Sequence, residues 1–146
     1  MSSLRYTDDD SIEDSDSVWR RIPPWHLVPD GKGGIRASSA AFEDHLENDK
    51  VHPMSVHLES VLYALGWDAR RVFEIAGCEG RGFRVARIAV GKVRELDQGI
   101  QRDPTRADPS HALVFAKSDR RRKTKSVSRT LQEAFTWVSD VDLRWQ

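Results

Sequence analysis

The chain has 146 residues, and its 23 lysines and arginines balance its 23 aspartates and glutamates, so its formal net charge is zero. A neutral molecule has no overall field that would draw it to nucleic acid or to an anionic membrane. No run of about 18 apolar residues is present to cross a bilayer, and the first ten residues lack the basic and apolar regions of an export signal. The one cysteine, Cys78, cannot form a disulfide within the chain. We therefore expect a cytoplasmic protein in which Cys78 is a buried, unreactive thiol.

The charges are unevenly distributed despite the neutral total. Residues 1–17 are rich in serine and aspartate and contain almost no apolar side chains, so their burial cannot offset the entropy lost on ordering. We expect residues 1–17 to form a disordered acidic tail and residues 18–146 to form a single domain with one core. The acidic residues of the tail are Asp8, Asp9, Asp10, Glu13, Asp14 and Asp16.

Short strands are predicted at the start of the domain. Residues 18–22 have the composition of a strand that stops at Pro23 and Pro24, because proline supplies no ladder hydrogen bond and restricts the residue before it. Residues 25–28 continue in extended form to a glycine-rich turn at residues 29–34. A hairpin whose second strand contains Ile35 and Arg36 is therefore expected.

Three helices are predicted in the middle of the chain. The apolar positions of residues 55–65 recur at helical spacing behind Ser55, which could serve as the N-cap, and Gly66 could end the helix. Residues 68–76 follow Asp68 as a second capped helix that stops at Gly77. Residues 84–97 are ambiguous, since they begin with an alternation, but their apolar positions fit the helical period better.

The last elements are a strand and a helix. Residues 112–115 form a short apolar run of strand length behind a Pro- and Asp-rich loop at residues 102–110. Residues 127–138 carry apolar side chains at helical spacing behind Ser126, which predicts one long amphipathic helix. Together these elements predict an α+β fold with a small mixed sheet of short strands packed by about four helices.

Several catalytic and metal-binding signatures are missing from the sequence. The glycine-rich turn lacks the Lys-Ser or Lys-Thr pair of a phosphate-binding loop, and no Gly-x-Ser-x-Gly elbow is present. His45, His52 and His57 lie among acidic residues, but their spacing is not that of paired metal ligands. We expect no metal, no cofactor and no covalent catalysis.

A basic run lies between the last predicted strand and helix. So many cations in one loop would attract phosphate groups, with an affinity that falls as salt rises, although a solvated loop is the simpler interpretation. A further hypothesis is that the acidic tail folds back on this loop and screens it until a polyanion displaces the tail. The cations are Arg120, Arg121, Arg122, Lys123 and Lys125.

A second group of candidate residues lies around the predicted turns at residues 20–56. It contains Arg20, Arg36, Ser39 and Ser55, next to short strands and a predicted helix start. Arginine side chains and hydroxyls near a helix N-terminus are typical ligands of phosphate or carboxylate. The same hydroxyls could instead be helix caps, and the arginines could pair with neighbouring acids.

Within this segment the chain resembles a family of small uncharacterised bacterial proteins. The resemblance spans most of residues 18–138, and similar sequences often have His where this chain has Pro23. It implies that five polar positions converge, His111 being the fifth, and that the protein is an accessory module of a bacterial multi-gene system of the defence kind. The matching elements are Arg20-Arg21-Ile22-Pro23-Pro24, Arg36-Ala37-Ser38-Ser39-Ala40-Ala41-Phe42, Met54-Ser55-Val56 and Pro109-Ser110-His111-Ala112.

The sequence therefore favours a non-enzymatic interaction module with a protein partner and a small anion-binding groove lined by Arg20, Arg36, Ser39, Ser55 and His111. A nucleotide or another phosphate is the ligand that such a groove would take. The first alternative is an enzyme acting on a nucleotide or nucleic acid, with His111 as general acid and base because its ordinary pKa is close to neutrality. The second is a nucleic-acid binder that uses the basic run at residues 120–125.

Overall fold

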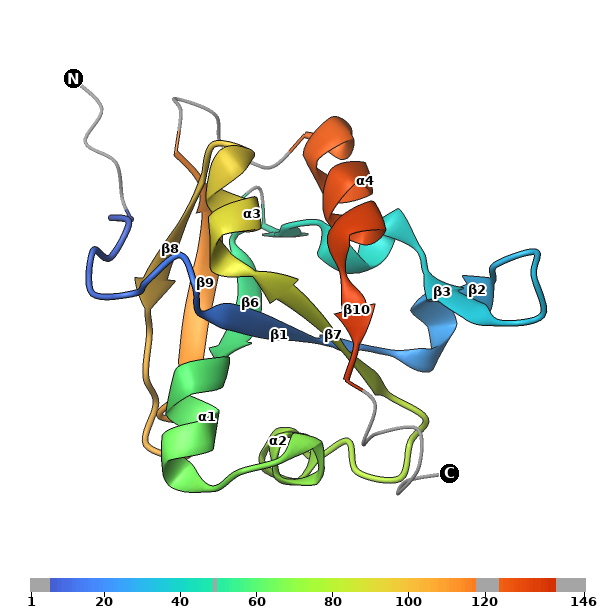
Figure 1. Ribbon diagram of the computed structural model, residues 1–146, viewed down its shortest axis with the longest axis horizontal. Helices are drawn as coiled ribbons and strands as arrows, with labels where there is room; N and C mark the ends of the chain where they lie inside the picture. The colour runs from blue at the N-terminus through green and yellow to red at the C-terminus, as the bar shows by residue number, and fades with distance from the viewer. Residues whose placement is uncertain (1–5, 49, 118–123, 139–146) are drawn as a thin grey trace.

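The computed structural model describes residues 6–48, 50–117 and 124–138. Its centre is a six-stranded sheet with the strand order β10-β7-β1-β6-β9-β8, and two short hairpins lie beside it (Figure 1). The strands are β1 (Ser17–Ile22), β2 (Leu27–Pro29), β3 (Ile35–Ala37), β4 (His45–Glu47), β5 (Lys50–His52), β6 (Met54–Leu58), β7 (Arg84–Ala89), β8 (Gln98–Arg102), β9 (His111–Ala116) and β10 (Thr136–Trp137). The helices are α1 (Glu59–Leu65), α2 (Ala69–Ala76), α3 (Val90–Glu95) and α4 (Lys125–Ala134), with short 3-10 turns η1 (Pro24–His26) and η2 (Ser39–Phe42).

The five ladders of the central sheet are antiparallel in the described part of the chain. Strand β1 is central and pairs along its whole length with β7, from Ser17 opposite Ala89 to Ile22 opposite Arg84. On its other side Val18 lies opposite Leu58 of β6. This register decides which side chains share a face, because successive side chains of a strand point to opposite sides.

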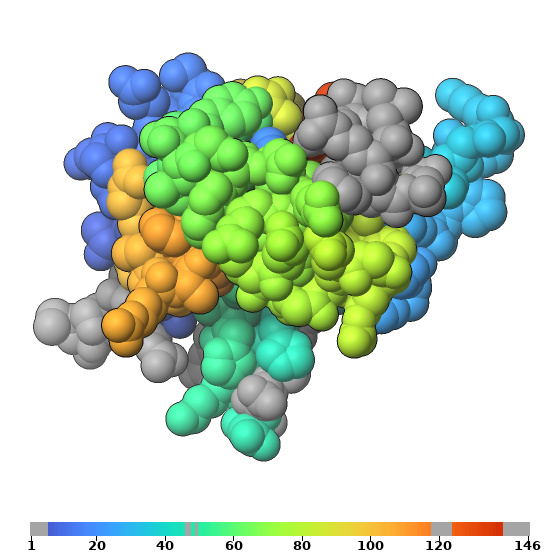
Figure 2. Space-filling model, turned by 90° about the horizontal axis from the view of Figure 1, so that it is seen from below, coloured from blue at the N-terminus to red at the C-terminus, as the bar shows by residue number. Residues whose placement is uncertain are grey.

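The two faces of the sheet build two separate hydrophobic cores. Val18 and Ile22 face the larger core, which α3, α4 and η2 cover, while Trp19 faces the smaller core under α1 and α2. Figure 1 shows these two layers of helices on opposite sides of the sheet, and Figure 2 shows α1 and α2 over the centre of the lower face. The α+β class and the four helices that the sequence predicts are confirmed.

Several elements form where their local signals predict them. The hairpin of β2 and β3 closes around the predicted turn, with Val28 opposite Arg36. Helix α2 begins at the cap Asp68, whose carboxylate accepts a hydrogen bond from the Arg71 amide, and ends at Gly77, whose φ of 72° suits glycine. These elements are specified by capping and turn residues that are close in sequence.

Two of the predicted helices begin as strands, and the sequence prediction is wrong there. Residues 54–58 form β6, so Ser55 is not a helix cap, and α1 starts at Glu59. Residues 84–89 form β7 and only residues 90–95 are helical. In β7, Val85 packs into one core and Ile88 into the other, so burial on both faces hides the alternation that would identify a strand.

The predicted C-terminal helix is also shorter than its apolar spacing suggests. Helix α4 is capped by Thr124, not Ser126, and stops at Ala134. Phe135 then has extended dihedral angles of −82° and 158°, and Thr136 pairs with Arg87 of β7. The β-branched and aromatic residues after Ala134 favour the sheet edge, and that pairing prevails over helical spacing.

The acidic N-terminal segment is packed where the structure describes it, contrary to the prediction of a disordered tail. We call residues 6–16 the N-terminal arm. Its Ile12 is 1% exposed in the larger core, and its Tyr6 ring lies 5.6 Å from the ring of Phe115. The arm also covers the edge strand β8, since the Asp9 amide donates to the Ile100 carbonyl at 2.9 Å. The polar average composition of the segment gives no indication of these few apolar and hydrogen-bond contacts. Residues 1–5 lie outside the described residues.

No helix in the described part of the chain combines the length and the apolar composition required to traverse a bilayer.

Candidate functional site

Arg20, the first residue of the predicted anion groove, is bound to the protein backbone. Its guanidinium donates from Nε to the Ala41 carbonyl at 3.0 Å and from Nη1 to the Ser55 carbonyl at 2.9 Å. Burial lowers the pKa of Arg20 to about 10. These hydrogen bonds connect β1 to β6 and to the η2 turn, so Arg20 stabilises the fold from inside the protein.

The five predicted groove residues are not all on one surface. Arg20 shares a face with Val18, whereas His111 lies opposite His57 on the other face of the sheet. Arg36 is exposed on the separate β2–β3 hairpin, and Ser39 is the first residue of η2. The backbone carbonyl of Ser55 accepts a hydrogen bond from Arg20. The structure therefore joins Arg20 to Ser55 and does not bring all five side chains together.

The histidines of β6 and β9 each have an acidic partner. His111 Nδ1 lies 3.0 Å from both the backbone oxygen and Oδ2 of Asp103. His57 is 3% exposed; its Nδ1 lies 2.9 Å from Asp108 Oδ2, and its Nε2 accepts a hydrogen bond from Arg21 Nε at 3.2 Å. This arrangement requires the His57 proton on Nδ1, because Nε2 is the acceptor.

Burial shapes the protonation of this network. It lowers the pKa of His57, in spite of the opposing effect of Asp108. Burial alone would raise the pKa of Asp108, but hydrogen bonds from His57 and Ser110 outweigh it and lower that pKa to about 2. At neutral pH the network is thus a neutral imidazole held by a carboxylate, which suits a structural role in the sheet.

The remaining sequence candidates are dispersed. His45 and His52 lie opposite each other on the β4–β5 hairpin, with ring centroids 5.9 Å apart, and His57 is on β6. The described residues contain no group of three or more potential metal ligands. Of the basic run, Arg120, Arg121, Arg122 and Lys123 lie outside the described residues, and Lys125 is exposed at the start of α4.

The N-terminal arm does contact one lysine just before the basic run. Lys117 Nζ lies 3.6 Å from Asp8 Oδ2. The hypothesis that the acidic segment screens the rest of the run is a statement about residues 118–123, which lie outside the described part of the chain.

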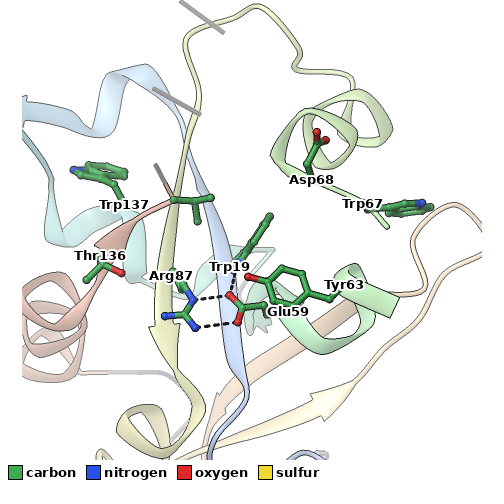
Figure 3. Close-up of a pocket in the computed structure, with 9 residues that line it drawn as sticks. Trp19, Glu59, Tyr63, Trp67, Asp68, Arg87, Thr136 and Trp137 are labelled. Atoms are coloured by element: carbon green, nitrogen blue, oxygen red, sulfur yellow. Dashed lines mark hydrogen bonds and ion pairs between the residues drawn. The ribbon is translucent and has the colours of Figure 1, made fainter. Parts of the chain in front are cut away.

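A pocket that the sequence did not suggest lies beside α1 and α2 on the lower face of the sheet (Figure 3). Its volume is about 410 Å³. In Figure 3, Glu59 and Tyr63 lie between Arg87 on one side and Trp67 with Asp68 on the other. The lining residues are Trp19, Glu59, Tyr63, Trp67, Asp68, Arg87, Thr136, Trp137 and Val138.

The floor of this aromatic pocket is an ion pair whose polar atoms are well satisfied. Glu59 accepts hydrogen bonds from Arg87 Nε at 2.5 Å, from Arg87 Nη2 at 2.9 Å and from Trp19 Nε1 at 2.8 Å. Burial alone would raise the pKa of Glu59, but the hydrogen bonds from Arg87 and Trp19 outweigh it, and that pKa is lowered. The floor is therefore a fixed carboxylate and guanidinium, and Arg87 also extends into solvent with a 45% exposed side chain.

The walls of the pocket are aromatic rings from different elements. Tyr63 on α1 is 65% exposed and meets the buried Trp19 edge to face at 6.4 Å. Trp67 lies between α1 and α2, and the guanidinium of Arg71 already lies 5.0 Å from its ring centre. Trp137 contributes at the rim, but Figure 3 shows its ring directed away from Tyr63. The pocket thus offers rings that attract both flat groups and cations.

No local signal in the sequence predicts this site. Its lining residues extend from Trp19 to Val138 and are joined only when β7 and β10 pair and α1 packs across β1.

Comparisons with known protein families, with curated proteins and with solved structures found no match to this chain.

Proposed function

We propose that the protein is a small interaction module that binds a partner protein through the aromatic pocket. The observation that carries this proposal is the 65% exposed Tyr63, which lines the pocket together with the Glu59–Arg87 ion pair. A rigid ring next to a preorganised ion pair is the arrangement that anchors partner side chains in protein interfaces. An accessory role in a bacterial multi-gene system agrees with such a module.

The lining of the pocket suits binding better than catalysis. Among the described residues that line it, the charged and hydroxyl side chains are Glu59, Arg87, Asp68, Thr136 and Tyr63, and none is a cysteine, histidine or lysine. The carboxylate and the guanidinium of the floor bind each other, so neither is poised for proton transfer. His111, the candidate base of the enzymatic alternative, is elsewhere and pairs with Asp103.

Selection from a random peptide display library tests this proposal. We expect the wild-type protein to enrich peptides whose affinity falls at least about tenfold for Tyr63→Ala, because a central aromatic anchor typically contributes about 1.4 kcal/mol or more. Trp25→Ala is the matched control, since Trp25 is 72% exposed and lies outside the pocket. It should change affinity less than about twofold.

The outcome that would contradict the proposal is equally definite. Either no peptide is enriched over an immobilised unrelated protein, or the enriched peptides bind Tyr63→Ala as tightly as the wild type. Circular dichroism of both variants confirms that each is folded before affinities are compared.

A further inference from the structure

A second hollow lies next to the aromatic pocket. Its volume is about 350 Å³, and it is lined by the N-terminal arm, α1 and Arg102 of β8. Glu59 and Tyr63 line both hollows, so the two are neighbours at α1. The arm contributes Glu13 and Asp16 to this second hollow. We call the two hollows together the α1 groove.

The charges of the α1 groove are predominantly negative. Its carboxylates are Glu13, Asp16, Glu59 and Asp68, and its cations are Arg87 and Arg102. Both cations are already used within the protein, and the carboxylates of Asp16 and Glu59 also accept hydrogen bonds, from Ser60 and Arg87. Arg87 binds Glu59 through two nitrogens, and Arg102 Nε lies 3.1 Å from Ser11 Oγ and 3.4 Å from Asp9 Oδ2.

The acidic groups line two hollows that share an aromatic side chain. Asp68 lines the aromatic pocket, Glu13 and Asp16 line the second hollow, and Tyr63 lines both. A cation that enters either hollow would therefore meet both an aromatic ring and a carboxylate. Ring and carboxylate attract a guanidinium or an ammonium group together, and both would repel an anion.

We infer that the partner segment that fits the α1 groove is basic and places an arginine or lysine side chain in each of the two hollows that Tyr63 lines. This inference rests on the proposed function and adds the chemistry of the partner. The protein uses the same pairing internally, since its own Arg71 lies over Trp67 and its own Arg84 lies 5.7 Å from the ring centre of Trp137.

Two conservative variants remove the relevant charges without removing structure. Asp68→Asn neutralises the aromatic pocket and keeps a good helix cap for α2, because asparagine caps as well as aspartate. Glu13→Gln removes one negative charge from the second hollow at an exposed position of the arm. Glu74→Gln is the matched control, since it removes an equal charge from an exposed position of α2 outside both hollows.

Fluorescence anisotropy with synthetic peptides tests the inference. The probes are fluorescein-labelled glycine-serine peptides that carry two arginines at varied spacing, and the comparison peptides carry two glutamates, two leucines or one arginine. We expect the diarginine series to bind best, each of Asp68→Asn and Glu13→Gln to weaken it about three- to tenfold, and Glu74→Gln to leave it within about twofold. Raising the ionic strength should weaken binding further.

The possible failures are distinguishable. Dileucine or diglutamate peptides that bind better than diarginine, and lose affinity in Tyr63→Ala, would overturn the basic partner while supporting the pocket. Unchanged diarginine binding in both Asp68→Asn and Glu13→Gln would also overturn it. Failure of every peptide, together with an empty display selection, would overturn both the basic partner and the proposed function.

Discussion

Replacing Arg94 by alanine should lower the free energy of unfolding by about 3 kcal/mol, because this side chain holds the N-terminal arm. Its guanidinium donates to Asp8 Oδ1 at 3.2 Å, to the Ile12 carbonyl at 2.8 Å and to Asp14 Oδ1 at 2.6 Å. Without Arg94 the carboxylate of Asp8 loses its guanidinium partner and keeps the Ile100 amide, and the carbonyl of Ile12 loses its donor. Urea unfolding followed by tryptophan fluorescence measures the change.

Lys92→Ala provides the control for Arg94, because Lys92 is on the same helix, α3, with a 45% exposed side chain. It should change the free energy of unfolding by less than about 0.5 kcal/mol. A cost below about 1 kcal/mol for Arg94→Ala would mean that the arm contributes little to the fold and would contradict its description as a packed element.

Replacing His57 by leucine should cost about 3 kcal/mol at neutral pH and should also change how stability depends on pH. The substitution removes the donor that faces Asp108 and the acceptor of Arg21 Nε inside the sheet, which leaves buried polar groups unpaired. Burial lowers the pKa of His57 in the folded protein below its ordinary value of 6.5. Just below pH 6.5, His57 therefore binds a proton more readily in the unfolded chain than in the folded protein. The wild type therefore loses stability from this histidine as pH falls below about 6.5.

The leucine variant lacks that proton uptake. Just below pH 6.5, the slope of unfolding free energy against pH should be smaller than in the wild type by up to about 1.4 kcal/mol per pH unit. His45→Leu, at an exposed position of β4, controls for the stability cost and should change the free energy of unfolding by less than about 0.5 kcal/mol. Equal slopes for His57→Leu and wild type would show that His57 titrates alike in the folded and unfolded chain.

The elements that could be predicted are those whose signals are local. The prolines after β1, the turn of the β2–β3 hairpin and the Asp68 cap of α2 each act within a few residues. Strands β6 and β7 could not be predicted in this way, because partners on both sides of each strand decide its conformation. Tertiary pairing overrides a helical spacing of apolar side chains when both faces are buried.

The candidate site was missed for a related reason. Arginines and hydroxyls near turns suggested an anion groove, but Arg20 is bound by the carbonyls of Ala41 and Ser55. The sequence shows which residues are arginines, serines and histidines, but it does not show which groups they contact in the fold. Conversely, the acidic arm was taken for a tail, and its Glu13 and Asp16 instead line the α1 groove.

The most direct test of the central claim is a nuclear magnetic resonance titration of the tryptophan indole N–H signals with a peptide obtained from the display selection. The signals of Trp67 and Trp19, which line the aromatic pocket, should shift with a common dissociation constant, and that of Trp25, outside the pocket, should stay in place. That result would support binding at the aromatic pocket. Saturating shifts confined to Trp25, or no shift of Trp19 and Trp67 at saturation, would contradict it.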